Sequence, residues 1–436
     1  MAAGWSVDSR TLQAGDVFFA LRGPNHDGHA HVAEAFRRGA AAAVVDREVA
    51  ADGVVLRVAD SLAALQRLAA KVRVQWNGEV VAVTGSAGKT STKDAIAEML
   101  TEGMNTAKNE GNLNNHVGLP LSLLRVPDNA RAAVLEIGMN HAGEIRELAA
   151  IARPQTAVVT NVGYAHIENF DSIEGIAATK RELIESLRPG GTAVLNADDV
   201  RVAAFAAAHP GRTVTYGQST EANVRAEEVE YSLDGVQFRV GGTRFESALI
   251  GRHSVSNILA GIAVAGVYGI APERLGERVR NLRPGKMRGE RFDCRGITVY
   301  NDCYNSNPDA ARAMLEVLRD TPAERRIAVL GEMLELGHWA EPLHRDVGSY
   351  AAVCGIDVLV GIRGAACYML DAAKRAGLRA DAAFFFEDPS AAGRLVRTLA
   401  QPGDAILFKG SRGVHVEKAL EQFVSAEPAP EAGGSG

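Results

Sequence analysis

The sequence predicts an α/β protein whose sheets are mostly parallel, and three observations favour that fold class. Short apolar runs of strand length alternate with longer stretches whose apolar residues follow helical spacing. Glycine-containing turns separate these segments, and such alternation is typical of a parallel sheet with helices on both faces. The length of 436 residues is sufficient for about two to four domains.

The first zone, residues 1–77, is predicted to be a small α/β unit. Residues 17–21 form a short apolar run that fits a buried strand, and residues 40–46 are expected to form another. Residues 31–38 are expected to be helical. Residues 59–76 are also expected to be helical, because their apolar positions share one helix face: Leu62, Leu65, Leu68 and Val72.

The second zone, residues 78–288, carries the clearest alternation. Four strands are expected here, at residues 80–83, 132–137, 156–160 and 191–195. Residues 225–250 differ, because aromatic and β-branched residues lie there among glycines and charges, and they are expected to form antiparallel hairpins. Residues 253–268, rich in Ala and Gly, are expected to form a closely packed helix.

The third zone, residues 289–424, is predicted to be a second α/β unit of ordinary domain size. A helix is expected at residues 308–319, and residues 425–436 are expected to form a disordered tail of Pro, Ala, Glu, Gly and Ser. The strands of this zone are expected at residues 297–300, 327–330, 357–360, 382–386 and 405–408.

Charge and composition argue against several classes of protein. Lys and Arg total 47 against 53 Asp and Glu, and this net charge of −6 argues against a general binder of nucleic acid or anionic membranes. No apolar run approaches the roughly 18 residues that cross a bilayer, and residues 1–10 lack a signal pattern. The cysteines lack CxxC spacing, which indicates a reducing, cytoplasmic setting without a zinc cluster: Cys294, Cys303, Cys354 and Cys367.

The strongest local signal is segment 84–90, Thr-Gly-Ser-Ala-Gly-Lys-Thr, between a predicted strand and a predicted helix. Its backbone N–H groups suit phosphate oxygens, Lys89 adds a positive charge, and the Thr90 hydroxyl suits Mg²⁺. The strict phosphate-loop pattern has a glycine where Val83 stands, so the loop is a shortened relative of that pattern. A glycine turn with an incidental lysine is the alternative interpretation. The candidate phosphate-binding residues are Gly85, Ser86, Ala87, Gly88, Lys89 and Thr90.

Polar residues end the next two predicted strands. Glu136 places a carboxylate at the carboxyl edge of the sheet, where a second Mg²⁺ ligand or a catalytic acid commonly lies. Segment 160–166, Thr-Asn-Val-Gly-Tyr-Ala-His, ends the following strand. Taken alone, His166 is typical of an ordinary loop histidine, and Lys180, in the helical stretch 176–183, of a surface lysine.

Together these features resemble the Mur ligases, the ATP-dependent amide-bond ligases of peptidoglycan synthesis. The glycine loop, Glu136, segment 160–166 and Lys180 occur in that order in the family. In the first zone, segments 8–10, 15–23 and 27–29 resemble the family's UDP-binding domain. Four further segments resemble the branch that adds D-alanyl-D-alanine to UDP-N-acetylmuramoyl-tripeptide: 109–115, 302–308, 331–337 and 409–412. The resemblance runs from Asp8 to about Phe423.

The resemblance implies three domains. Residues 1–77 would be an N-terminal UDP-substrate-binding α/β domain, residues 78–288 a central ATP-binding domain with the phosphate loop on a parallel sheet, and residues 289–424 a C-terminal Rossmann-like ligase domain. It implies a cytoplasmic, monomeric ligase that uses ATP, two Mg²⁺ ions and a carbamylated Lys180. Its substrates would be UDP-N-acetylmuramoyl-tripeptide and D-alanyl-D-alanine, which react through an acyl phosphate.

The resemblance also implies individual roles. Lys89 and its loop would hold the ATP phosphates, while Thr90 and Glu136 hold the first Mg²⁺. His166 would reach the second Mg²⁺, together with a carbamate on Lys180, since a cationic lysine cannot ligate a metal. Arg288 would reach the phosphates, with Arg291 as an open alternative. The remaining assignments are Asn257 to adenine; Asp302, Tyr304 and Asn305 to the nucleotide site; Ser9 and Arg10 to UDP; Asn112, Asn114 and Asn115 to the muramoyl peptide; and Asn305, Asn307, Lys409, Ser411 and Arg412 to D-alanyl-D-alanine.

The sequence also departs from the family pattern, and rival interpretations remain. Asp8 stands almost at the start of the chain, so the strand before it is expected to be absent or trimmed. A ligase that adds the third residue to the UDP-muramoyl dipeptide is the first rival, although the Asp-Asn-Pro-Arg type segment of diaminopimelate-adding members is missing here. A phosphate-loop binding protein without ligase activity is the second. Segments 302–308 and 409–412 argue against it, because they would then have no role.

Overall fold

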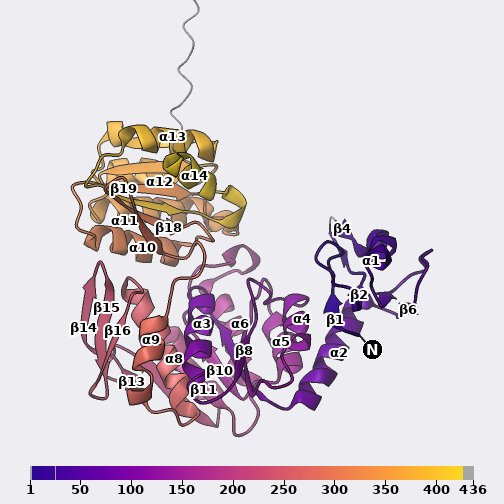
Figure 1. Cartoon of the computed structure of the whole chain (residues 1–436). Helices are drawn as coiled ribbons and strands as arrows, with labels where there is room; N and C mark the ends of the chain where they lie inside the picture. Colours follow the sequence, from indigo (N-terminus) through magenta and orange to yellow (C-terminus); the bar gives the residue numbers. More distant parts are fainter. Residues whose placement is uncertain (1, 25, 426–436) are drawn as a thin grey trace, which may run out of the picture.

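The computed structural model describes residues 2–24 and 26–425 and contains three principal α/β units (Figure 1). The C-terminal unit lies over the central one in this view, and the N-terminal unit, in indigo, lies to one side. Apart from Ser425, the predicted tail falls outside the described residues. Within those ranges, no helix combines the length and apolar character needed to cross a membrane. The predicted α/β class with parallel sheets is confirmed.

The N-terminal sheet has the order β1-β2-β5-β6, with all strands parallel. The expectation that the first strand is missing is wrong: β1 pairs with β2 but spans only three residues, too short for an alternating pattern to reveal it. The strands are β1 (Gly4–Ser6), β2 (Asp16–Phe19), β5 (Ala42–Val45) and β6 (Val55–Arg57), beside a small hairpin of β3 (Arg22–Gly23) and β4 (His26–Asp27). The helices are η1 (Gly28–His31), α1 (Val32–Arg37) and α2 (Ser61–Trp76).

Helix α2 connects this unit to the central one. The Asp60 side chain caps its first turn by accepting a hydrogen bond from Ala63 N, and the helix ends at Asn77 in the left-handed conformation, with φ 52°. The buried Arg73 side chain donates to Ala152 O at 2.7 Å, and Trp76 Nε1 donates to Ala130 O at 2.9 Å. Both bonds hold the helix against the central unit.

The central sheet has the order β13-β12-β11-β10-β7-β9-β8, and every strand is parallel to its neighbours. Strand β7 lies between β10 and β9, so the three loops that follow these strands share one edge of the sheet. The strands are β7 (Glu79–Thr84), β8 (Thr106–Lys108), β9 (Ala132–Glu136), β10 (Thr156–Val159), β11 (Thr192–Asn196), β12 (Arg212–Gly217) and β13 (Val224–Arg225).

Helices cover both faces of this sheet because successive residues of β7 point to opposite sides and both sides are apolar. Val81 and Val83 pack toward α3 and α8, while Val80 and Ala82 join the core under α4, α5 and α6. The helices are α3 (Lys89–Leu100), α4 (Gly118–Leu124), α5 (Glu144–Ala152), α6 (Ile173–Glu185), α7 (Val200–Ala203), α8 (Arg252–Val267) and α9 (Gly276–Asn281), with η2 (Ile167–Asn169), η3 (Ala204–Ala208) and η4 (Pro272–Arg274). The predicted hairpins form an antiparallel sheet of β14 (Glu227–Ser232), β15 (Gly235–Val240) and β16 (Thr243–Ser247).

The C-terminal sheet has the order β17-β18-β22-β19-β20-β21, and only the β17–β18 pair is antiparallel. The register pairs Asp302, at the end of β18, with Lys409, at the end of β22. The strands are β17 (Glu290–Cys294), β18 (Ile297–Asp302), β19 (Arg326–Gly331), β20 (Val358–Ile362), β21 (Ala383–Phe386) and β22 (Ala405–Lys409). The helices are α10 (Pro308–Asp320), α11 (Ala340–Val353), α12 (Ala366–Arg375), α13 (Pro389–Leu399) and α14 (Glu417–Val424), with η5 (Gly337–Trp339), η6 (Ala380–Ala382) and η7 (Arg412–Val414).

Candidate active site

The glycine loop joins β7 to α3 through two positions where only glycine fits. A Cβ on Gly85 would lie 1.8 Å from Thr160 Oγ1. Gly88 is the N-cap of α3 with φ 77°, and a Cβ there would lie 2.7 Å from Asn257 Oδ1. The loop backbone therefore runs in close contact with the segment after β10 and with α8. Its amides are brought to the N-terminus of α3, an arrangement suited to phosphate oxygens.

The segment after β10 holds the glycine loop in shape. Ser86 Oγ donates to Gly163 O at 2.9 Å, and Thr160 Oγ1 donates to Ala87 O at 2.7 Å. Ala87 N donates to Asn161 Oδ1 at 2.8 Å. Asn161 lies in segment 160–166, but the sequence analysis gave it no role of its own. These bonds preorganise the loop from a strand about 70 residues away along the chain.

Lys89 folds back over its own loop. Its Nζ donates to Gly85 O at 2.8 Å, and burial in the loop lowers the pKa of the Lys89 ammonium from its ordinary value. One bond leaves two further ammonium donors available. An anion bound against the loop amides would lie beside this cation.

Thr90 and Glu136 meet at the carboxyl edge of the central sheet. Thr90 Oγ1 donates to Glu136 Oε2 at 2.7 Å, and Asn114 Nδ2 donates to Glu136 Oε1 at 2.7 Å. The Glu136 side chain is buried at 3% exposure, so these two bonds determine its orientation. A hydroxyl and a carboxylate side by side are oxygen ligands of the kind that Mg²⁺ prefers, and the pair fits such an ion.

Two residues to which the sequence analysis gave no role support Glu136. Asn109 Oδ1 accepts a hydrogen bond of 2.9 Å from Glu136 N. Lys93, on α3 and only 2% exposed, donates from Nζ to Asn109 O at 2.8 Å. The sequence did carry a signal for Lys93: it lies four positions after Lys89 in the same predicted helix, and helical spacing places both lysines on one face.

Lys180 lies inside the central unit rather than on its surface. The side chain is 1% exposed on α6, and its ammonium forms no hydrogen bond to any of the residues that the structure describes. Burial, followed by the positive charge of Lys89, holds the pKa of Lys180 well below its usual range. The interpretation of Lys180 alone as a surface lysine is therefore wrong.

His166 contacts the C-terminal unit. It adopts the left-handed conformation with φ 62°, and its Nδ1 lies 2.5 Å from Glu335 Oε2. This contact lowers the pKa of the Glu335 carboxyl. In the described part of the chain, no cluster of three or more His, Cys, Asp or Glu side chains is arranged to hold a metal ion.

A cavity of about 410 Å³ opens beside α8 and the start of the C-terminal unit. Its lining includes three residues from the predicted nucleotide set: Asn257, Arg288 and Arg291. The Arg288 guanidinium carbon lies 3.8 Å from the centroid of the Tyr304 ring, so these two predicted residues stack on each other. Asp302, Tyr304 and Asn305 do not line this cavity.

The predicted dipeptide-binding residues of the C-terminal unit are mostly engaged in local contacts. Lys409 is 2% exposed, and its Nζ donates to Asp302 Oδ2 at 2.6 Å and to Asn305 O at 2.9 Å. Asn307 caps α10 and donates from Nδ2 to Ser86 O at 3.4 Å, a contact between two units. Ser411 Oγ accepts from Leu334 N, and Arg412 pairs with Glu417 at 3.1 Å.

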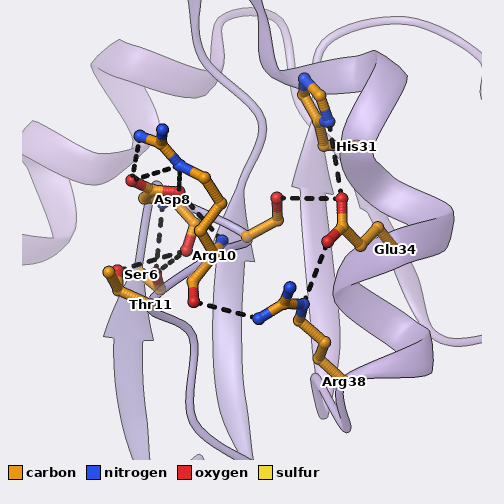
Figure 2. A network of polar contacts seen from close by, with 8 residues as sticks. Ser6, Asp8, Arg10, Thr11, His31, Glu34 and Arg38 are labelled. Atoms are coloured by element: carbon orange, nitrogen blue, oxygen red, sulfur yellow. Dashed lines mark hydrogen bonds and ion pairs between the residues drawn. The ribbon is translucent and has the colours of Figure 1, made fainter.

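Ser9 and Arg10 belong to a polar network in the N-terminal unit, and Figure 2 labels Arg10 with Asp8, Glu34 and Arg38 within it. Arg10 is 80% exposed, and its side chain donates to both carboxylate oxygens of Asp8, at 2.9 and 3.2 Å from Nε and at 2.7 Å from Nη2. Arg38 donates to Arg10 O at 3.0 Å, and Glu34 accepts from both Arg38 and the Ser9 hydroxyl. Helix α1 therefore holds the backbone of the Ser9–Arg10 segment.

The predicted muramoyl-peptide asparagines divide into two groups. Asn114 reaches the Glu136 carboxylate, as described above, and so joins the candidate active site. Asn115 Oδ1 accepts from Val117 N and Gly118 N, a local Asx-type turn that leads into α4. Asn112 is exposed and forms no side-chain hydrogen bond with the described residues.

Known proteins resemble the whole chain. Models of the Mur ligase family match in order: "Mur ligase family, catalytic domain" over residues 3–86, "Mur ligase middle domain" over residues 83–265, and "Mur ligase, glutamate ligase domain" over residues 287–412. The UDP-N-acetylmuramoyl-tripeptide–D-alanyl-D-alanine ligase of Bacillus subtilis is 34% identical over 97% of this chain and 93% of its own length. Its Escherichia coli counterpart is 33% identical over 95% of this chain and 92% of its own length.

Solved structures of Mur ligases also resemble this chain over most of its length. A crystal structure of MurF from Acinetobacter baumannii superposes with a TM-score of 0.89 and 30% identity, covering 96% of this chain and 93% of that one. The MurF ligase of Thermotoga maritima in complex with ADP superposes with a TM-score of 0.85 and 28% identity, covering 96% of each chain. The glycine loop, the buried Glu136 and the three-unit architecture therefore have one explanation, which is that the chain belongs to the Mur ligase family.

Proposed function

We propose that the protein ligates D-alanyl-D-alanine to UDP-N-acetylmuramoyl-tripeptide at the expense of ATP, giving UDP-N-acetylmuramoyl-pentapeptide, ADP and phosphate. The observation that carries this proposal is the likeness, over more than nine-tenths of the chain, to ligases that bear this name. The glycine loop beside Thr90 and Glu136 supplies a site suited to ATP.

The reaction has two steps. A carboxylate oxygen of the tripeptide attacks the γ-phosphorus of ATP, the bond to the β-phosphate oxygen breaks, and ADP leaves an acyl phosphate behind. The amino group of D-alanyl-D-alanine then attacks the acyl carbon. The tetrahedral intermediate expels inorganic phosphate, and the amine loses a proton as the amide forms.

Both partners of the first step are anions, so the site must neutralise charge. Lys89 and the loop amides face the phosphates in this proposal, and Arg288, held by Tyr304, approaches from the edge of the cavity. Thr90 and Glu136 would hold one Mg²⁺, which when bound would screen the phosphate charges. Asn257 in the cavity lining fits a contact to adenine, with Asp302, Tyr304 and Asn305 assigned to the same site.

His166 and Lys180 would serve a second Mg²⁺. Lys180 is buried without a hydrogen-bond partner among the described residues, which suits covalent modification rather than a solvated cation. Its neutral amine would add to CO₂, forming the N–C bond of a carbamate and releasing one proton. The carbamate would be an anionic oxygen ligand beside Lys89.

The substrates would meet between the units. Ser9 and Arg10 are assigned to UDP, with Asn112, Asn114 and Asn115 toward the muramoyl peptide. The dipeptide is assigned to Asn305, Asn307, Lys409, Ser411 and Arg412, although the buried Lys409 acts through Asp302 and the backbone at Asn305 in this structure.

We place the domain boundaries at residues 77–78 and 288–289. Asn77 has φ 52° and Gly289 φ 70°, and such loop positions can absorb the backbone changes of a hinge. Domain closure on the substrates is expected to shrink the small-angle scattering radius when an ATP analogue and the UDP-substrate bind together. An unchanged profile would contradict closure. We propose a monomer that works in the cytoplasm.

A phosphate-release assay tests the function and separates its rivals. Release that requires both UDP-N-acetylmuramoyl-tripeptide and D-alanyl-D-alanine is expected. Release supported instead by a UDP-dipeptide with a single amino acid would indicate the ligase for the third residue. ATP hydrolysis indifferent to every substrate would indicate a phosphate-loop protein without ligase activity.

A further inference from the structure

The contact between His166 and Glu335 joins two units of the protein at the candidate active site. His166 follows β10 in the central unit, whereas Glu335 follows β19 in the C-terminal unit. His166 Nδ1 is buried, forms no hydrogen bond of regular geometry with the described residues, and lies 2.5 Å from Glu335 Oε2 as an ion-pair contact. Among the described residues, Glu335 is the one charged partner that lies against this nitrogen. The carboxylate therefore faces one specific ring nitrogen.

The backbone segments around this contact also touch each other. Glu168 N donates to Glu335 O at 3.2 Å. A Cβ on Gly337, whose φ is 51°, would lie 3.2 Å from Glu168 Cα, so the two loops touch through their backbones. His166 and Glu335 are also both in the left-handed region, with φ 62° and 63°. Non-glycine residues adopt this conformation at a cost, and such residues concentrate at functional sites.

A carboxylate on one ring nitrogen determines what the other nitrogen can do. With the proton held on Nδ1 by Glu335, Nε2 keeps its lone pair and can act as a ligand. Carboxylates commonly orient metal-binding histidines in this way and make them better ligands. The residues present therefore fit a histidine prepared to coordinate through Nε2.

We propose that Glu335 is a positioning residue that orients His166 for the second Mg²⁺, and that it does so only when the C-terminal unit is docked on the central one. This inference rests on the proposed function, because that function assigns His166 to the metal. Formation of the metal site is thereby coupled to domain docking. The enzyme would then assemble its second ion site only in the closed arrangement.

The first test is Glu335→Ala, with Glu341→Ala as matched control. Glu341 lies on α11 of the same unit and pairs only with Arg345 among the described residues. Glu335→Ala is expected to lower kcat about 10- to 100-fold and to raise the Mg²⁺ concentration for half-maximal rate, with an unchanged KM for the UDP-substrate. Glu341→Ala is expected to match the unaltered protein. Unchanged kcat and Mg²⁺ dependence in Glu335→Ala would overturn the proposal.

The second test does not depend on turnover. Nitrogen-15 NMR of histidine-labelled protein, with the signal assigned through His166→Ala, is expected to show the proton on Nδ1 and its loss from that nitrogen in Glu335→Ala. An unaltered tautomer in Glu335→Ala would refute the positioning role even if activity fell. The double variant His166→Ala/Glu335→Ala is expected to be no slower than His166→Ala, whereas additive losses would contradict a shared role. Absence of substrate-dependent phosphate release by the unaltered protein would instead refute the proposed function, and the NMR result still decides the contact.

Discussion

Thr90 Oγ1 and Glu136 Oε2 lie 2.7 Å apart, although 46 residues separate them along the chain. Thr90 lies in the first turn of α3, which follows β7, and Glu136 ends β9, the neighbouring strand. Parallel pairing places both at one sheet edge, and Asn114 and Asn109 hold the carboxylate in place. The pair is the best-defined candidate magnesium site in the described structure.

Glu136→Gln is expected to reduce kcat at least about 100-fold. The substitution preserves the shape of the side chain but removes its negative charge. A bound metal supplies several kcal/mol of transition-state stabilisation, and each 1.36 kcal/mol lost slows the rate about tenfold. Phosphate release at varied Mg²⁺ measures the effect. Glu98→Gln, at a half-buried position of α3 where Glu98 pairs with Arg278, is the control and should keep the unaltered rate and Mg²⁺ dependence. A normal rate at low Mg²⁺ in Glu136→Gln would remove Glu136 from the metal site.

Lys180→Ala is expected to abolish activity, because alanine cannot carry a carbamate. Added bicarbonate should not restore the rate, whereas short carboxylic acids should restore part of it by occupying the vacated space. Phosphate release with each additive is the measurement. Lys374→Ala, on the exposed part of α12, is the control. Full activity in Lys180→Ala would contradict the assignment.

Gly85→Ala is expected to disrupt ATP use, since its Cβ would lie 1.8 Å from Thr160 Oγ1 and would force the loop away from its supports. The KM for ATP should rise at least about tenfold, because the loss of one or two hydrogen bonds between the loop and the phosphates costs about 1.4 kcal/mol or more of binding free energy. Gly266→Ala is the matched control: this exposed glycine on α8 has open space around its Cβ position, so alanine should stabilise the helix by about 0.5–1 kcal/mol. An unchanged KM for ATP in Gly85→Ala would show that the loop tolerates the methyl group.

Lys409→Met is expected to destabilise the protein by about 3–5 kcal/mol, because it leaves the Asp302 carboxylate without its buried partner. Thermal melting should show a clear decrease, and the double variant Lys409→Met/Asp302→Asn should recover part of it. Lys418→Met, at an exposed position on α14, is the control. Unchanged melting with a raised KM for D-alanyl-D-alanine would instead indicate that Lys409 contacts the dipeptide directly.

The Asp8 carboxyl is expected to have an unusually low pKa. Hydrogen bonds from Arg10 lower the pKa of the Asp8 carboxyl from 3.8 to about 2. Because the folded pKa lies below the unfolded one, the pair contributes stability above about pH 3.8 and loses it as the pH falls toward 2. The contribution is small, since the pair is exposed to solvent. NMR titration should show a pKa near its ordinary value in Arg10→Gln and an unchanged low value in Arg37→Gln. A normal Asp8 pKa in the unaltered protein would contradict the pairing.

Much of the fold could be predicted from local patterns. Apolar runs located β7, β9 and β10 to within one residue or two, and the glycine loop located the start of α3. Strand β1 was missed because three residues carry no readable period, and β12 because its burial is partial. The chemistry of the loop was equally local, since glycines, a lysine and a threonine at fixed spacing are sufficient to suggest phosphate binding.

The sequence by itself determined the fold class, the phosphate loop and the family resemblance, because these depend on the order and spacing of residues along the chain. Only the tertiary structure decided which distant side chains meet. The register between β18 and β22 pairs Lys409 with Asp302, and the docking of two units brings Glu335 to His166. It also decided that Lys180 is buried, since a single lysine on an amphipathic helix carries no local sign of what packs over it. The spacing of residues in the sequence shows which residues are close along the chain, whereas the order of strands in a sheet and the docking of domains determine which residues are close in space.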